Sequence, residues 1–127
     1  MYKNLTIASV LGVIAVILGA FGAHALKGKL SADALQSFET AVRYQFLHVL
    51  VLLFVNTFKE FNIKQKNSIS LLLILGILLF SGSIYAIYLF EVPVKSIWFI
   101  TPLGGVLLII AWVLMTFHFV KKALKSE

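Results

Sequence analysis

The chain has no cysteine, few charged residues and only two prolines. Without thiols it has no disulfides, no thiolate zinc site, no iron–sulfur cluster and no cysteine nucleophile. Charged residues make up 13% of the 127 positions, whereas a soluble domain has roughly 25%. Hydrophobic residues make up 61%. This balance excludes a water-soluble globule, and it also excludes disorder, which requires few apolar residues and many charges.

The few charges that are present have a strong bias in sign. Eleven basic residues stand against five acidic ones, which gives a formal net charge of +6. In so apolar a chain the expected partners of this charge are anionic membrane lipids, and we expect no nucleic-acid partner.

Stretches without Lys, Arg, Asp or Glu mark the segments that a bilayer core of about 30 Å accepts, because about 20 helical residues cross it. Residues 4–26, 67–90 and 96–120 are such stretches of full length. The stretch 44–58 is shorter, so its helix has to begin before Arg43, in the apolar pattern that starts at Ala34. The sequence therefore predicts an all-α, integral membrane four-helix up-down bundle. It is one domain, residues 1–127, with helices at about 4–26, 36–58, 67–90 and 98–120.

The first apolar stretch also has features of a cleaved signal peptide, since Lys3 precedes it and Ala23 and Ala25 imitate a cleavage site. We favour a retained helix, because the run is longer than the 7–15 residues of a usual signal core. Basic residues in short loops then predict the orientation. With both termini in the cytoplasm, seven basic residues lie inside and four outside: Lys3, Lys59, Lys64, Lys66, Lys121, Lys122 and Lys125 against Lys27, Lys29, Arg43 and Lys95.

Small residues are expected where membrane helices approach closely, because lipid provides little hydrophobic drive for association. Candidate packing positions are Gly12, Gly19, Gly22, Gly82, Gly104 and Gly105. The alternative is that glycine and alanine are simply common in membrane helices. Thr101 and Pro102 predict the cap and first turn of the fourth helix, with Trp98 just before it at the outer interface.

Two charged residues lie in the second predicted helix, where an ionisable group is costly. Glu39 and Arg43 are four residues apart and are expected to form an ion pair on one face. This pair is either an ordinary interfacial one with a snorkelling arginine or a clamp for an anion or lipid headgroup. His24, at the outer end of the first helix, is expected within reach of either residue.

Polar residues at similar depth in the second and third helices predict a buried cluster. His48 lies 11 positions before Lys59, about 16 Å along the helix, which is near the bilayer midplane. The alternatives are a ligand site and a set of helix–helix hydrogen bonds without a ligand. The predicted cluster contains Tyr44, Gln45, His48, Ser81, Ser83 and Tyr85.

No catalytic motif accompanies these residues. The sequence has no metalloprotease, serine-hydrolase or phosphate-loop pattern. The three histidines and Glu39 match no standard metal spacing, so we expect neither a metal nor a cofactor. His118, close to Lys121, is expected at the inner interface with no special role.

The same residues carry a family resemblance. Residues 18–26 (LGAFGAHAL), 40–45 (TAVRYQ) with His48, 81–85 (SGSIY) and 101–105 (TPLGG) resemble the small membrane-protein family called domain of unknown function 423, or uncharacterised protein family 0382. The resemblance covers essentially the whole chain. It implies four helices in a bacterial plasma membrane, and it implies no particular activity.

Three hypotheses about function are therefore open. The first is a non-enzymatic protein that binds a lipid or small amphiphile, with the His24, Glu39 and Arg43 region at the outer mouth of the site. The second is a structural or assembly factor that joins copies of itself or another membrane protein. The third is a membrane enzyme that uses His48 as a general base beside Tyr44.

Overall fold

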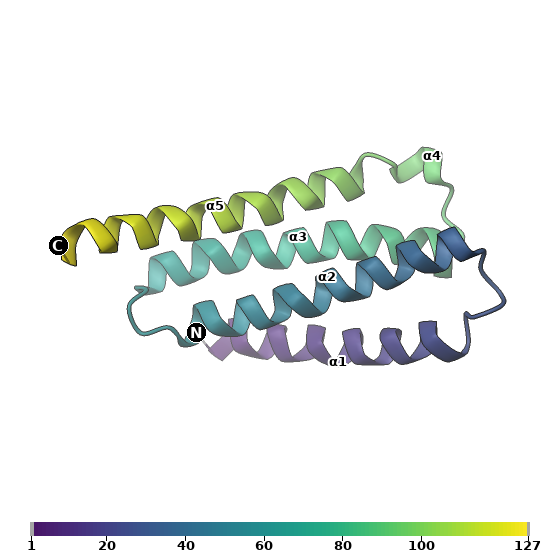
Figure 1. Ribbon diagram of the computed structural model, residues 1–127, viewed down its shortest axis with the longest axis horizontal. Helices are drawn as coiled ribbons and strands as arrows, with labels where there is room; N and C mark the ends of the chain where they lie inside the picture. The colour runs from purple at the N-terminus through teal and green to yellow at the C-terminus, as the bar shows by residue number, and fades with distance from the viewer. Residues whose placement is uncertain (1, 127) are drawn as a thin grey trace.

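The computed structural model describes residues 2–126 as helices joined by short connections. Four long helices, α1 (Tyr2–His24), α2 (Ala32–Thr57), α3 (Ile63–Leu89) and α5 (Ile100–Ser126), run up and down. A single helical turn, α4 (Val94–Ile97), precedes the last of them. The long helices pack in the order α1, α2, α3, α5, and both ends of the chain lie at the same end of the bundle (Figure 1). The predicted all-α four-helix bundle is confirmed, and each long helix is long and apolar enough to cross a membrane.

Helices α2 and α3 each begin four residues earlier than the sequence pattern predicts, and capping explains both starts. The hydroxyl of Ser31 accepts a hydrogen bond of 3.1 Å from the backbone N–H of Ala34, so α2 begins at residue 32 rather than 36. Asn62 and Gln65 form a reciprocal capping box, so α3 begins at residue 63 rather than 67. Charge-free stretches mark the apolar middle of a membrane helix, whereas caps set its ends.

The predicted cap at Thr101 is wrong. Helix α5 begins at Ile100, so Thr101 and Pro102 both lie in its first turn, where the missing N–H of proline is harmless. The hydroxyl of Thr101 instead contacts the hydroxyl of Ser83 on α3.

The buried core is narrow and lies between the helices, while large apolar side chains cover the outside. Outward-facing residues of α1, such as Val13 and Val16, are more than half exposed. An apolar exterior of this extent is unfavourable in water and suits lipid. The core contains Ala8, Leu11, Val49, Leu52, Val55, Ile69, Leu73, Ile77, Leu108, Ala111 and Met115.

Glycines allow the closest helix contacts, at two pairs of neighbouring helices. A Cβ atom built at Gly104 would lie 2.8 Å from the backbone carbon of Leu79, so α5 approaches the main chain of α3 here. One built at Gly22 would lie 2.8 Å from the ring of Phe38 on α2. Gly12, Gly19 and Gly105 make ordinary contacts with Val49, Val42 and Phe80. The prediction of Gly82 as a packing position is wrong, since nothing lies within 4 Å of a Cβ built there.

A polar network that the sequence analysis missed joins three helices near the chain ends. Asn56 of α2 is fully buried and donates to Ser70 of α3 at 2.8 Å. Asn4 of α1 donates to Asn56 and to Asn67, both at 3.0 Å. Asparagine can bridge helices in lipid because its amide both donates and accepts. These residues fix the relative height of α1, α2 and α3.

Candidate functional site

The predicted polar cluster is divided among separate contacts rather than gathered around one space. Gln45, only 2% exposed, lies where α1, α2 and α3 meet. Its amide nitrogen donates to the carbonyl of Leu11 at 2.7 Å, and its oxygen accepts from the hydroxyl of Tyr85 at 2.7 Å. The ring of Tyr85 also packs against Phe38. Both polar ends of Gln45 are therefore occupied by the bundle itself.

The two serines make helix–helix contacts as well. Ser81 of α3 is buried and donates to the carbonyl of Ala41 on α2 at 2.7 Å. Ser83 contacts Thr101 of α5 and donates to the carbonyl of Phe80 at 3.0 Å. Thus the two serines face opposite neighbours, although only one residue separates them.

His48 links α2 to α5 and has a defined hydrogen-bonding state. Its Nδ1 lies 2.7 Å from the carbonyl oxygen of Tyr44, which can only accept, so Nδ1 carries the hydrogen. Its Nε2 accepts a 3.0 Å hydrogen bond from the indole N–H of Trp112. The ring is therefore the neutral Nδ1–H tautomer, and neither nitrogen is free to act as a base.

Tyr44 meets His48 through its carbonyl and not through its hydroxyl. Its ring stacks on Phe80 with centroids 4.9 Å apart, and the residue is 42% exposed. The geometry that the enzyme hypothesis requires, a hydroxyl beside a free imidazole nitrogen, is not present.

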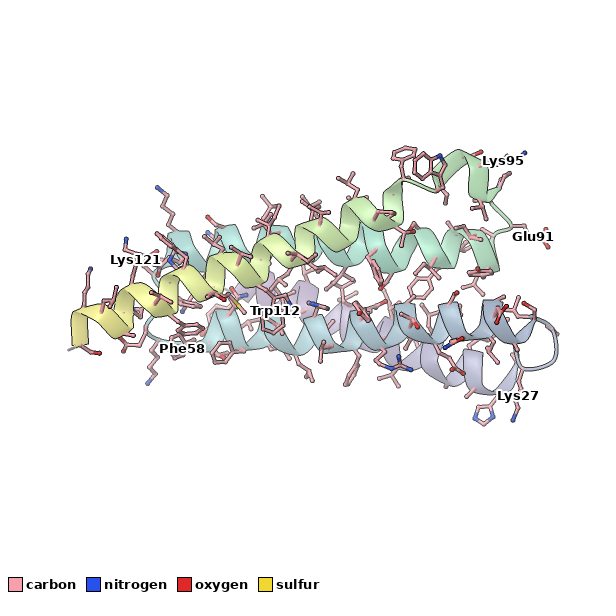
Figure 2. The ribbon with its side chains drawn as sticks, turned by 45° about the horizontal axis from the view of Figure 1, so that its top comes forward. Lys27, Phe58, Glu91, Lys95, Trp112 and Lys121 are labelled. Carbon is pink, nitrogen blue, oxygen red and sulfur yellow. The ribbon has the colours of Figure 1, made fainter. Side chains whose placement is uncertain are left out.

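A groove of about 500 Å³ opens between α2 and α5 beside this histidine. Trp112 lies on α5 at the side of the molecule toward α2 (Figure 2). One rim of the groove carries the cation Arg43, and the remaining surface is apolar or aromatic. The groove is lined by Arg43, Tyr44, Leu47, His48, Gly105, Leu108, Ile109 and Trp112.

The outer group of predicted site residues does not come together. Arg43, Glu39 and His24 are all exposed. Within residues 2–126 an ion pair joins Lys122 and Glu60, whose charged atoms are 3.9 Å apart. Arg43 and Glu39 form no ion pair there. The expected pairing of Arg43 with Glu39 is therefore absent from the described residues, and within them His24 forms no ion pair with Glu39. An i,i+4 spacing on a helix permits such a pair but does not require it.

No buried polar side-chain atom of the described residues is left without a hydrogen-bond partner. No three of the metal-binding side chains His, Asp and Glu come together in residues 2–126. Of the predicted site residues, Arg43, Tyr44 and His48 line the groove, whereas Gln45, Ser81, Ser83 and Tyr85 bind neighbouring helices.

Two partners of the predicted residues escaped the sequence analysis. Trp112 pairs with His48, and Thr101 with Ser83, and both belong to α5. The predicted cluster contained residues of the second and third helices only, whereas α5 provides both partners. A signal was available, because Trp112 lies nine residues before Lys121, about 13 Å inside the helix and away from the interface where tryptophan is favoured.

Comparisons with known proteins agree with the membrane architecture. The family model described as protein of unknown function, DUF423, matches residues 18–105. A UPF0382 membrane protein of Staphylococcus aureus is 41% identical over 110 residues, covering 84% of this chain and 88% of that protein. A UPF0382 membrane protein of Haemophilus influenzae is 38% identical over 117 residues, covering 91% of each chain. The UPF0382 inner membrane protein YgdD of Escherichia coli is 38% identical over 116 residues, covering 87% of this chain and 84% of that protein.

No solved structure matches the chain. The family match spans all four sequence motifs and the residues that line most of the groove. The relatives are membrane proteins by name, as the four apolar helices of this chain require. The chain belongs to the DUF423 family, the UPF0382 membrane proteins.

Proposed function

We propose that the groove between α2 and α5 binds an anionic amphiphile, with an acyl chain along its apolar wall and the negative headgroup on Arg43. The observation that carries this proposal is the position of Arg43. Its guanidinium is exposed at the rim of the groove and has no carboxylate partner among the described residues.

The depth of Arg43 makes an unpaired state costly. Residue 43 lies 14 positions before Thr57, so it is about 21 Å from the inner end of α2. If that end marks one boundary of a hydrocarbon core about 30 Å thick, the backbone of Arg43 lies about 9 Å inside the other boundary. An arginine so placed needs the interface, water or an anion. A lipid phosphate or carboxylate satisfies it, and the guanidinium fork matches either group.

The rest of the groove is suited to hydrocarbon. Leu47, Leu108 and Ile109 supply aliphatic surface, while Gly105 adds no side chain of its own. A volume of about 500 Å³ is in the range of small-molecule sites. Because both ring nitrogens of His48 are occupied, this site holds its ligand without chemistry on it.

Brominated lipids provide a direct test, because bromine quenches the fluorescence of a nearby tryptophan. In a Trp98→Phe background, Trp112 in the groove is the remaining tryptophan, and its fluorescence is excited selectively at wavelengths that tyrosine does not absorb. Brominated phosphatidylglycerol, diluted in phosphatidylcholine bilayers, is expected to quench Trp112 more strongly than brominated phosphatidylcholine at the same dilution. One cationic side chain near the surface corresponds to about a fivefold preference for the anionic lipid.

The matched variants are Arg43→Gln and Lys27→Gln. Both remove one positive charge, but Lys27 does not line the groove. The stronger quenching by brominated phosphatidylglycerol is expected to disappear in Arg43→Gln and to persist in Lys27→Gln. Equal quenching by the two lipids, or an unchanged preference in Arg43→Gln, would refute the proposal.

A structural role is the second candidate, and the contacts of Gln45, Ser81, Ser83 and Tyr85 favour it. All four bind neighbouring helices, so the polar residues serve the packing of the bundle. Crosslinking in native membranes discriminates this role, because an assembly factor gives a reproducible partner or a homo-oligomer. A lone monomer in the same experiment excludes it.

The orientation with both termini in the cytoplasm belongs to the same proposal, for a bacterial plasma membrane. It is supported by the location of both chain ends at one end of the bundle and by seven of the eleven basic residues at that end. Since the chain has no cysteine, a single Ser126→Cys substitution provides a unique label site. A membrane-impermeant maleimide is expected to label it in inverted vesicles and not in intact cells; the reverse pattern would overturn the orientation.

A further inference from the structure

A second polar recess, distinct from the groove, lies where α5 passes the start of α3. It has a volume of about 120 Å³ and is lined by Gln65, His118, Lys121, Lys122 and Lys125. Lys121 lies at the end of the bundle that also holds Phe58, far from Lys27 and Glu91 (Figure 2). The four residues from α5 follow the spacing i, i+3, i+4 and i+7, so they occupy one face of the helix.

The charges around this recess are unbalanced. Lys121 and Lys125 are four residues apart and Lys122 and Lys125 three apart, which are spacings at which like charges on a helix repel. Lys122 forms an ion pair with Glu60, with the two charged atoms 3.9 Å apart. Glu60 lines a neighbouring recess and not this one. Three lysines therefore face one small space whose lining contains no carboxylate.

The hydrogen bonds of the recess also favour an anion. The oxygen of Gln65 accepts from the backbone N–H of Asn62, so its amide nitrogen is the atom 3.1 Å from Nδ1 of His118. Since that nitrogen donates, Nδ1 accepts, and the hydrogen of the neutral ring is on Nε2. Residues 2–126 provide no hydrogen-bond acceptor for this Nε2–H. The recess is therefore lined by three lysines, which only donate, and by a histidine whose Nε2–H has no partner within residues 2–126.

The size of the recess limits the ligand. Its volume of about 120 Å³ is much smaller than the roughly 500 Å³ of the groove at Arg43. A small anion such as phosphate therefore suits this recess better than a whole nucleotide. The start of α3 lies beside the recess through Gln65, its third residue, and the positive end of a helix dipole adds to the attraction.

We infer that this recess is a phosphate-binding site, formed by His118, Lys121, Lys122 and Lys125 with Gln65 orienting the histidine. The ligand is a phosphate group, carried either by a phospholipid headgroup at the membrane surface or by a soluble phosphate. The site is independent of the groove at Arg43, and its test uses other residues.

The experiment uses the full chain in nanodiscs and records the ring resonances of His118 by NMR. One arm titrates inorganic phosphate into phosphatidylcholine nanodiscs, and the other compares phosphatidylcholine nanodiscs with nanodiscs that contain phosphatidylglycerol. A shift of the His118 resonances with inorganic phosphate identifies a soluble ligand. A shift with phosphatidylglycerol alone identifies a lipid headgroup. Either result supports the site.

The variants separate a built site from diffuse positive charge. Lys121→Gln and Lys125→Gln each remove one lysine of the recess, whereas Lys59→Gln removes an exposed lysine at the same end of the bundle. Each of the first two is expected to weaken binding about fivefold, and the third to leave it within about twofold. The inference is overturned if neither ligand shifts His118, or if all three variants weaken binding equally.

Discussion

Replacing Gln45 by methionine tests whether the polar contacts between helices stabilise this bundle. Methionine preserves the length of the side chain and removes both hydrogen bonds, the 2.7 Å bond to Leu11 and the 2.7 Å bond from Tyr85. Each hydrogen bond between membrane helices contributes about 0.6 kcal/mol on average and at most about 1.7 kcal/mol. Removal of two bonds is therefore expected to lower the free energy of unfolding by about 1.2 to 3.4 kcal/mol. The upper part of this range applies if the hydroxyl of Tyr85 finds no other partner.

A double-mutant cycle isolates the shared bond. Tyr85→Phe removes the bond to Gln45 and leaves the bond of Gln45 to Leu11 in place, so the two single losses count the shared bond twice. The double variant is expected to lose less than their sum by about 0.6 to 1.7 kcal/mol. The measurement is reversible unfolding in mixed micelles, and Gln36→Met, at an exposed position on the same helix, is the control. If the two single losses of unfolding free energy sum to the loss of the double variant within about 0.3 kcal/mol, the coupling between α2 and α3 at this bond is refuted.

Two further predictions concern helix packing. Gly104→Ala places a methyl group against the backbone of Leu79 and Phe80 and is expected to lower thermal stability strongly. Gly82→Ala, in open space, is expected to leave it unchanged or raise the free energy of unfolding by up to about 1 kcal/mol; similar effects of the two substitutions would contradict the close contact of α5 with α3. Asn56→Leu removes the bonds to Asn4 and Ser70 and is expected to speed amide hydrogen exchange in the first turns of α1 while leaving α5 unchanged. Uniformly faster exchange would instead indicate general loss of packing.

Capping and polar pairing explain why helix ends and polar partners were harder to predict than helix number. The start of α2 depends on Ser31 and that of α3 on Asn62, and neither residue changes the apolar pattern from which the spans were counted. The depth of His48 along α2 was predictable from the distance to Lys59. The depth of Trp112 within the last helix was also visible in the sequence, but its pairing with His48 was not, because the two residues belong to helices that are not consecutive in the chain.

The rotation of each helix about its own axis decides which polar residues meet. Ser81 and Ser83 lie at the same depth, yet one contacts α2 and the other α5. Spacing along the sequence places residues on a face, but it does not say which neighbour that face contacts. The predicted ion pair of Glu39 and Arg43 is also absent from the described residues, and Arg43 lies at the rim of the groove.

The sequence by itself determined that this chain is helical, with four helices that are long and apolar enough to cross a membrane and that alternate in direction. Each of these properties follows from the composition and spacing of neighbouring residues, which set helix formation and transfer to lipid locally. Only the tertiary structure decided that the buried polar residues are paired within the bundle, that His48 is occupied by Trp112, and that Arg43 and the lysines of α5 lie beside open recesses. These outcomes depend on which faces of distant helices come together, because a hydrogen bond or an unpaired charge is defined by the few ångströms around it.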